Sequence, residues 1–299
     1  MSDQASGRSN DMTTGTANDT RSGAAGDMAS AVAGGHEAPP AWLRRLAAQT
    51  RDVDPATLVA PTRLPPDEAQ LRRAAVLMLF GPDEQERLSV VLTQRSAQLR
   101  SHAGQVAFPG GRIDPSDDGP IGAALRESYE EVGLGPHSVA VVGLLPELFV
   151  PVSRSAVTTV LGWAPVPAPL WARSTLEVDA VARVPLDRLV DPAHRIVATH
   201  PAGYASPAFD LPDLYIWGFT ALLLDRVLEL AGLALPWDRS RERPLPERFG
   251  RPMQSRGLSG TPPTESAATE SAASWAAANG SAASGSAHGA SGHAPGARQ

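Results

Sequence analysis

The feature that most constrains this chain is a turn, a loop and a helix between residues 104 and 134. The Pro109-Gly110-Gly111 stretch predicts a tight turn, an acidic loop follows it, and a helix is expected at about residues 120–132. Pro120 suits the first turn of that helix, and Gly133 suits a left-handed C-cap. We take this unit as the part around which the rest of the chain is organised.

Three glutamates of the predicted helix, Glu127, Glu130 and Glu131, share one face because residues three and four apart are neighbours on a helix. Their like charges destabilise the helix, and the helix dipole disfavours anions in its last turns. A Mg²⁺ or Mn²⁺ ion would remove both penalties, and carboxylate oxygens suit such hard cations. Arg126 could hold one of these carboxylates in place. The alternative is a solvated acidic face on a surface helix.

Both ends of the 299-residue chain are poor in large apolar side chains and rich in small ones. Such segments cannot bury enough apolar surface to offset the entropy of ordering them. We therefore expect disordered low-complexity tails at residues 1–38 and 241–299. Between them we expect an N-terminal helix and a proline-rich linker at 39–73, followed by one domain at 74–240.

Composition excludes several classes of function. The absence of cysteine excludes disulfides, thiol catalysis and thiolate metal sites. The net charge of −6 gives no electrostatic footprint for nucleic acid. No apolar run reaches the length of a membrane span, and the N-terminus lacks the layout of a secretory signal. We expect a cytoplasmic protein without nucleic-acid or membrane partners.

Apolar runs and helical patterns are mixed along the central part of the chain. Residues 74–80 and 88–93 predict two strands of a hairpin. Further strands are expected at 105–108, 139–145, 157–163 and 181–184, and paired edge strands at 195–199 and 204–209. Helices are expected at 41–50, 186–190 and 217–230. This order predicts an α+β fold layered around one mixed sheet.

The central stretch resembles the Nudix box, the signature of hydrolases that cleave a nucleoside diphosphate linked to another group. Residues 126–134, RESYEEVGL, match its R-E-x-x-E-E-x-G-aliphatic core, and Gly111 matches its opening glycine. Asp117 or Asp118 fills the acidic position after that glycine, in a loop one residue longer than the general pattern. Ser128 stands where an aliphatic or small residue is usual. The resemblance implies a Nudix-type α/β/α sandwich around a mixed β-sheet.

The resemblance extends upstream of the box. Residues 92–96 (LTQRS), Arg100, Gly104 and the FPGG sequence at 108–111 are similar to the extra motif of the coenzyme A pyrophosphatase branch, and only Val91 departs from it. Residues 215–218 (YIWG) resemble the start of that branch's closing helix. The likeness weakens at 153–162. There Arg154, Ser155 and Thr159 stand where the branch has glycine, an aromatic residue and proline.

This resemblance implies a metal-dependent pyrophosphohydrolase that acts on a small-molecule nucleotide. It would cleave coenzyme A or acyl-CoA to adenosine 3′,5′-bisphosphate and 4′-phosphopantetheine, or its acyl derivative, with Mg²⁺ or Mn²⁺ as cofactor. The alternatives are a Nudix hydrolase of another nucleoside diphosphate derivative, such as ADP-ribose or NADH, and a Nudix-fold binding module without turnover.

The resemblance also assigns roles to residues. The expected metal ligands are Glu127, Glu130, Glu131 and the carbonyl of Gly111. Arg126, Glu130 and Glu177 are assigned to catalysis, with Glu147 and Asp179 as alternatives to Glu177 for the general base. The expected substrate-binding residues are Arg95, Arg100, Gly104, Phe108, Gly110 and Arg112.

Overall fold

The computed structural model of the protein describes residues 38–51, 53–58, 71–99, 102–167, 169–201 and 203–249. Most of the two predicted tails, most of the proline-rich linker and Arg100 lie outside the described residues. In the described part of the chain, no helix has the length and apolar character needed to cross a membrane.

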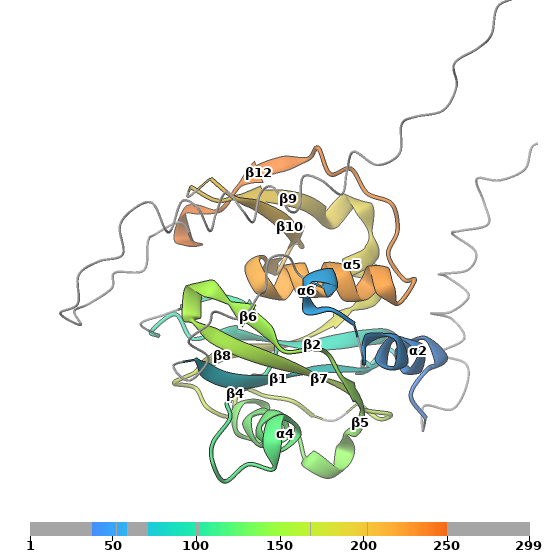
Figure 1. Cartoon of the computed structure of the whole chain (residues 1–299). Helices are drawn as coiled ribbons and strands as arrows, with labels where there is room; N and C mark the ends of the chain where they lie inside the picture. The colour runs from blue at the N-terminus through green and yellow to red at the C-terminus, as the bar shows by residue number, and fades with distance from the viewer. Residues whose placement is uncertain are drawn as a thin grey trace, which may run out of the picture.

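Four long strands form the centre of an eight-stranded mixed sheet (Figure 1). Strand β1 (Arg72–Pro82) lies between β2 (Leu88–Arg95) and β7 (Ser155–Trp163), and β8 (Val178–Pro185) pairs with β2. The pair β1–β7 is parallel, whereas β1 and β2 form the predicted antiparallel hairpin. The shorter strands of this sheet are β3 (Val106–Ala107), β4 (Gly110–Arg112), β5 (Ala140–Leu144) and β6 (Leu148–Val150).

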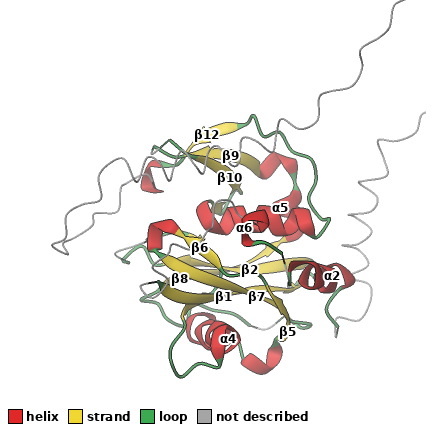
Figure 2. Ribbon diagram, viewed as in Figure 1, coloured by secondary structure: helices red, strands yellow, loops and turns green. Residues whose placement is uncertain are grey.

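Helices cover both faces of this sheet (Figures 1 and 2). Helix α4 (Gly119–Val132) packs on one face, where Leu77 belongs to a core shared with the helix. Helices α5 (Leu186–Val190) and α6 (Gly218–Leu230) lie on the other face, where Met78 belongs to a larger core. Alternate residues of β1 thus serve two cores, which explains its uninterrupted apolar run. The predicted α+β class with helical layers on a mixed sheet is confirmed.

The prediction of a single sheet is wrong, because four strands form a second sheet on the far side of α6 (Figure 1). Its order is β11-β10-β9-β12, with β9 (Arg195–Thr199), β10 (Ala205–Asp210), β11 (Tyr215–Ile216) and β12 (Glu242–Pro244). The predicted pairing of β9 with β10 is confirmed, but each has a second neighbour, so neither is an edge strand. Phe209 and Ile216 are buried in the core that also contains α6. The sheet is therefore joined to α6 by apolar packing.

The N-terminal helix α2 (Ala41–Thr50) was predicted and is part of the folded unit. The ring of Trp42 makes an edge contact with Phe80 of β1 at a centroid distance of 5.1 Å, and Leu46 is fully buried. Helix α3 (Pro55–Leu58) follows, and β1 begins slightly before the predicted domain start at residue 74. The segment expected to precede the domain therefore contributes to its core.

The C-terminal boundary also differs from the prediction. Strand β12 lies within residues 241–299, which were expected to be a disordered tail, yet it pairs in parallel with β9. The side chain of Leu245 is buried next to this pair, and Arg243 forms an ion pair with Asp210 at 2.6 Å. Composition alone missed this segment because its order depends on contacts with residues more than thirty positions away. The folded unit continues to Phe249.

A buried ion pair joins the second sheet to α6. Arg195 of β9 is fully buried and its guanidinium contacts the carboxylate of Asp225 in α6, which is also buried. The rings of Phe209 and Trp237 lie over the same guanidinium at 4.4 and 4.6 Å. Removing one charge from such a pair leaves the other buried without compensation.

We therefore predict that Asp225→Asn lowers the free energy of unfolding by about 3 kcal/mol, because the Arg195 charge stays buried without its counter-ion. Urea denaturation followed by circular dichroism measures this change. Asp213→Asn is the control: Asp213 pairs with Arg188 but is largely exposed, and its loss should cost less than about 0.5 kcal/mol. Equal effects of the two substitutions would contradict the assignment of Asp225 as a structural partner.

Candidate functional site

Helix α4 presents its C-terminal turns to the glycine turn as the sequence predicts. Its inner face buries Ala123, Ala124 and Val132 against the sheet. Gly133 ends the helix with a φ of 75°, and its N–H donates to the carbonyl of Tyr129 at 3.1 Å. The predicted left-handed C-cap is thus confirmed, and the helix holds its glutamates in a fixed position.

Two glycines of the Pro-Gly-Gly turn pack directly against the glutamates of α4. A Cβ atom at Gly110 would lie 2.4 Å from the carbonyl oxygen of Ala75, and its φ of 150° favours glycine. The Gly110 N–H donates to Oε2 of Glu131 at 3.0 Å. A Cβ atom at Gly111 would lie 2.5 Å from the carboxylate of Glu127. The turn therefore contacts two of the three predicted ligands.

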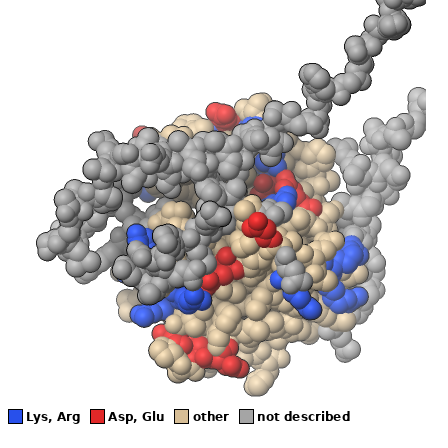
Figure 3. All heavy atoms as spheres, in the orientation of Figure 1, with Lys and Arg blue, Asp and Glu red and all other residues tan. Residues whose placement is uncertain are grey.

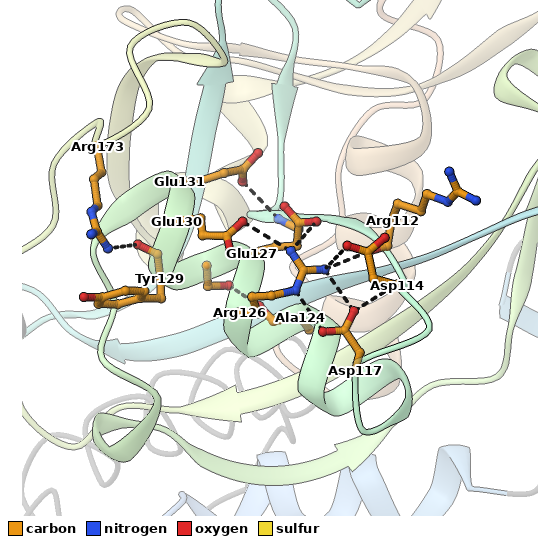
Figure 4. A network of polar contacts seen from close by, with 12 residues as sticks. Arg112, Asp114, Asp117, Ala124, Arg126, Glu127, Tyr129, Glu130, Glu131 and Arg173 are labelled. Atoms are coloured by element: carbon orange, nitrogen blue, oxygen red, sulfur yellow. Dashed lines mark hydrogen bonds and ion pairs between the residues drawn. The ribbon is translucent and has the colours of Figure 1, made fainter.

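Arg126 lies at the centre of a polar network on the outer side of α4 (Figure 4). Its Nε and Nη2 donate to the two carboxylate oxygens of Asp117 at 2.8 and 2.9 Å. Its Nη1 donates to Glu127 at 3.0 Å and to Glu130 at 3.2 Å. Of the two aspartates that sequence left open, Asp117 is therefore the one that contacts the arginine. The role expected for Arg126, which is to hold a helix carboxylate in place, stays a prediction.

Burial and like charges act together on the inner carboxylates. Glu131 is 3% exposed, and burial, with added repulsion from Glu127 and Glu177, raises its pKa to about 7. The Gly110 N–H and the charge of Arg95 oppose this shift. Burial also raises the pKa of Glu127, with further repulsion from Glu130 and Glu177, against the attraction of Arg126. Carboxylates that repel one another in a desolvated place are what a bound cation would stabilise.

The carboxylate oxygens of Glu127, Glu130 and Glu131 are suitable ligands for a hard divalent cation. In this structure these carboxylates accept hydrogen bonds from other protein groups. Among the residues that the structure describes, no three carboxylate or imidazole groups are already arranged to hold a metal ion. Arg126 donates to Glu127 and Glu130, and the Gly110 N–H donates to Glu131. Glu130 is the most exposed of the three, with 52% of its side chain accessible. Binding of a metal by all three would require Glu130 to turn away from Arg126.

The structure distinguishes among the three residues considered for the general base. Glu147 forms an ion pair with Arg73 at 3.3 Å, and Asp179 accepts a hydrogen bond from the Ala97 N–H at 2.8 Å. Glu177 is exposed, and its charge raises the pKa of both Glu127 and Glu131. Glu177 is therefore the one of the three whose charge acts on the inner carboxylates.

The residues predicted to bind substrate differ in their burial and in their contacts. The Nε of Arg95 is buried without a hydrogen-bond partner among the described residues, and its charge acts on Glu131. Gly104, with a φ of 68°, donates its N–H to the Arg95 carbonyl at 3.0 Å. The side chain of Phe108 is 4% exposed and packs in the larger core. Arg100 lies outside the described residues.

Arg112 contributes its backbone to the network, because its carbonyl accepts from Nη2 of Arg126 at 3.0 Å. Its own guanidinium points away from the carboxylates (Figure 4). On the surface, acidic side chains gather over α4 with basic side chains beside them (Figure 3). The carboxylates of α4 are thus interleaved with Arg126, and other basic side chains lie beside them.

Sequence reasoning missed Trp171 and Arg173, which lie between β7 and β8. Their backbone N–H groups donate to the carbonyls of Val132 and Glu131 at 3.3 and 2.8 Å. Nothing in the local sequence marked them, since neither forms part of a motif. Only the position of Arg173 four residues before Glu177 could have drawn attention to it.

The ion pair between Arg126 and Asp117 generates a prediction about acid stability. The hydrogen bonds from Arg126 hold the pKa of Asp117 at about 2, below the usual 3.8. The carboxylate therefore contributes stability above about pH 4, and this contribution is lost as the pH falls toward 2. We expect Asp117→Asn to lower the free energy of unfolding at pH 7 by about 1 to 2 kcal/mol, allowing for partial exposure of the arginine.

Urea denaturation of both proteins at pH 7, 4 and 2 measures the difference, which should shrink to near zero at pH 2. Asp114→Asn is the control because Asp114 is half exposed and 3.8 Å from Arg126. A difference between wild type and Asp117→Asn that stays constant down to pH 2 would contradict the ion pair.

A family model and several curated proteins are similar in sequence to the central part of this chain. Residues 70–204 match the family model described as NUDIX domain. The chain is 36% identical over 167 residues to a probable nudix hydrolase of Schizosaccharomyces pombe, covering 55% of this chain and 58% of the relative. It is 44% identical over 131 residues to an uncharacterized Nudix hydrolase, NudL, of Citrobacter koseri, covering 44% of this chain and 65% of the relative. The chain thus spans about three fifths of the length of these relatives.

Among solved structures, a Nudix hydrolase from M. smegmatis, RenU, aligns with a TM-score of 0.40 and 21% identity. That alignment covers 56% of this chain and 90% of RenU. The Nudix domain of Shewanella oneidensis NrtR, solved with ADP-ribose, aligns with a TM-score of 0.33 and 22% identity over 40% of this chain and 75% of that chain. The family model and the curated relatives agree with the glycine turn and the glutamate helix on one conclusion: residues 70–204 of this chain are similar to a Nudix domain.

Proposed function

We propose that this chain is a metal-dependent pyrophosphohydrolase that cleaves the diphosphate of coenzyme A or acyl-CoA. The products would be adenosine 3′,5′-bisphosphate and 4′-phosphopantetheine, or its acyl derivative. The observation that supports this best is the grouping of carboxylates and an arginine at the glycine turn. Glu127 and Glu131 pack against the turn, and the charges of Glu177 and Arg95 act on the same buried glutamate.

The proposed metal ligands are Glu127, Glu130, Glu131 and the Gly111 carbonyl. Mg²⁺ or Mn²⁺ held there would neutralise diphosphate oxygens and acidify the attacking water. Release of Glu130 from Arg126 would complete this set, and Arg126 would keep its paired hydrogen bonds to Asp117. The role of Arg126 is then to fix the orientation of the helix carboxylates.

The remaining residues act directly on water and phosphate. Glu177 would accept the proton of the attacking water, because it is exposed and lies close enough to influence both inner glutamates. Arg95, whose charge already acts on Glu131, would stabilise the negative charge that develops on a phosphate oxygen. The Gly110 N–H would keep Glu131 in place.

The preference for coenzyme A rests on the motif upstream of the turn. In the structure this motif is strand β2, the loop after it and strand β3. The Arg95 N–H donates to the Gln105 carbonyl at 2.9 Å, which closes the base of the loop. The charge of Arg95 acts on the buried carboxylate of Glu131, which supports a place for Arg95 at the site. Arg100, four residues after Ser96 in this loop, is our proposed partner for the 3′-phosphate that distinguishes coenzyme A from other dinucleotides.

One observation favours another nucleoside diphosphate derivative, such as ADP-ribose or NADH. Arg154 stands where the coenzyme A branch has glycine, and it adopts the left-handed backbone that glycine favours, with a φ of 50°. Arg154 thus places a large cationic side chain at a backbone position that favours glycine. If Arg154 reaches the substrate, it would change which group is accepted and leave the hydrolysis unchanged.

A substrate panel separates these proposals. Purified protein is incubated with Mn²⁺ or Mg²⁺ and with coenzyme A, acetyl-CoA, ADP-ribose or NADH, and the products are resolved by chromatography. We expect adenosine 3′,5′-bisphosphate from the first two substrates. Turnover of ADP-ribose or NADH without coenzyme A would overturn the coenzyme A assignment alone. No turnover of any of them would favour a binding module and overturn both enzyme proposals.

We predict that Glu131→Gln lowers kcat by at least about 100-fold, because the amide neither binds a cation as the carboxylate does nor takes its charge. Its melting temperature should not fall, since the substitution removes a buried charge whose pKa is raised. Glu147→Gln is the matched control and should keep wild-type kcat. Titration with Mn²⁺ followed by electron paramagnetic resonance should show weakened binding only for Glu131→Gln. Near-normal activity of Glu131→Gln would refute the ligand assignment.

A further inference from the structure

The segment between β7 and β8 forms a cap on the C-terminal end of α4. The last carbonyls of a helix have no partner within the helix. Here the Trp171 N–H donates to the Val132 carbonyl at 3.3 Å, and the Arg173 N–H donates to the Glu131 carbonyl at 2.8 Å. Residues 171–173 thus bind the backbone of the residue that carries the most buried carboxylate of the site.

Side chains reinforce this cap at both of its residues. The Nη1 of Arg173 donates to the Tyr129 carbonyl at 3.2 Å, and its guanidinium lies 4.1 Å from the centre of the Tyr129 ring (Figure 4). The ring of Trp171 packs on Gly133, where a Cβ atom would lie 2.9 Å from it. Arg173 therefore places positive charge at the negative end of the helix dipole, which α4 lacks among its own last residues.

The same segment leads directly to Glu177. The N–H groups of Glu177 and Val178 both donate to the Ser174 carbonyl at 2.9 Å, so a tight turn links Arg173 to Glu177. On its other side, the Glu177 carbonyl accepts from the Ser96 N–H at 2.8 Å. Glu177 is thus held between the end of α4 and the residue that follows Arg95.

We propose that Arg173 is a positioning residue that fastens residues 171–177 to α4 and so fixes Glu177 beside Glu127 and Glu131. This inference rests on the proposed function, in which Glu177 accepts the proton of the attacking water. The fastening matters because Glu177 is exposed on a loop, and the hydrogen bonds of Trp171 and Arg173 to α4 and of Glu177 to Ser174 restrain its backbone. Proton transfer requires hydrogen-bonding reach, so a small displacement of Glu177 would slow the reaction.

If the contacts of Arg173 with α4 were only incidental surface contacts, the prediction would be different. Arg173 is exposed, and an exposed contact of this kind contributes little to global stability. Its loss would then change neither the kinetics nor the local opening of the segment. The positioning role instead predicts a selective loss in kcat, with substrate binding and metal binding retained.

The experiment uses the full-length protein and three variants: Arg173→Ala, Arg173→Lys and Arg243→Ala. The last is the matched control, because Arg243 is also exposed and makes one ion pair, with Asp210 on the second sheet. We expect Arg173→Ala to lower kcat about tenfold or more with KM and Mn²⁺ affinity within about twofold. Arg173→Lys should recover part of kcat, since an ammonium group can donate to the Tyr129 carbonyl. Arg243→Ala should match wild type.

Amide hydrogen exchange gives a second readout that does not depend on turnover. The Trp171 and Arg173 amides should exchange about tenfold faster in Arg173→Ala than in Arg243→Ala. Wild-type kcat and unchanged exchange in Arg173→Ala would overturn the inference. If the protein hydrolyses none of the substrates, both the proposed function and the role of Arg173 in positioning Glu177 for catalysis are wrong. The exchange result then decides whether the fastening itself exists.

A double-mutant cycle with Glu177→Gln tests whether Arg173 acts through Glu177. If it does, Arg173→Ala should add no further loss of kcat once Glu177 is replaced. Losses that multiply would overturn the positioning role. Wild-type kcat of Glu177→Gln would remove Glu177 as the base, and with it the reason for fixing this residue.

Discussion

The hydrogen bond from the Gly110 N–H to the buried carboxylate of Glu131 joins the two parts on which the site depends. It exists only because the turn lies directly on β1, where any side chain at residue 110 would collide with the backbone of Ala75 and Val76. The turn can approach β1 so closely because β4 pairs with that strand in register. The position of Glu131 is therefore set by sheet pairing, by an absent side chain and by the packing of α4.

The two sides of α4 use carboxylates in opposite ways. On the outer side, Arg126 neutralises Asp117 with two hydrogen bonds and holds its pKa low, which stabilises the loop that leads into the helix. On the inner side, Glu131 is buried with little compensation, and its pKa is raised to about 7. The Arg126–Asp117 ion pair thus stabilises the outer side of α4. On the inner side, the buried carboxylate of Glu131 lacks such an ion pair, and a bound cation would compensate its negative charge. Functional sites are where such local conflicts are expected.

The parts that sequence predicted are those whose signals lie within short stretches. The hairpin of β1 and β2, helix α4 and its Gly133 cap follow from apolar runs, Pro120 and a glycine at the end of a periodic pattern. The second sheet could not be predicted in the same way, because β12 joins β9 across more than forty residues and its own sequence is polar. The contacts of Arg173 with α4 were missed for the same reason, since forty-four residues separate it from Tyr129. The choice between Asp117 and Asp118 likewise required the position of Arg126.

The residues of the candidate site come from two kinds of segment, which differ in whether their side chains can be exchanged without a collision. The proposed metal ligands lie on α4 and on the turn, where Gly110 and Gly111 leave no room for side chains. The proposed phosphate-binding and proton-accepting residues lie at the end of β2, on the loop after it and on the segment before β8. These two segments are tied together, because Ser96 donates to the Glu177 carbonyl and Ala97 donates to Asp179. Ser96 and Ala97 directly follow Arg95, the proposed phosphate-binding residue, so a change in this loop would also shift the backbone of Glu177, the proposed general base.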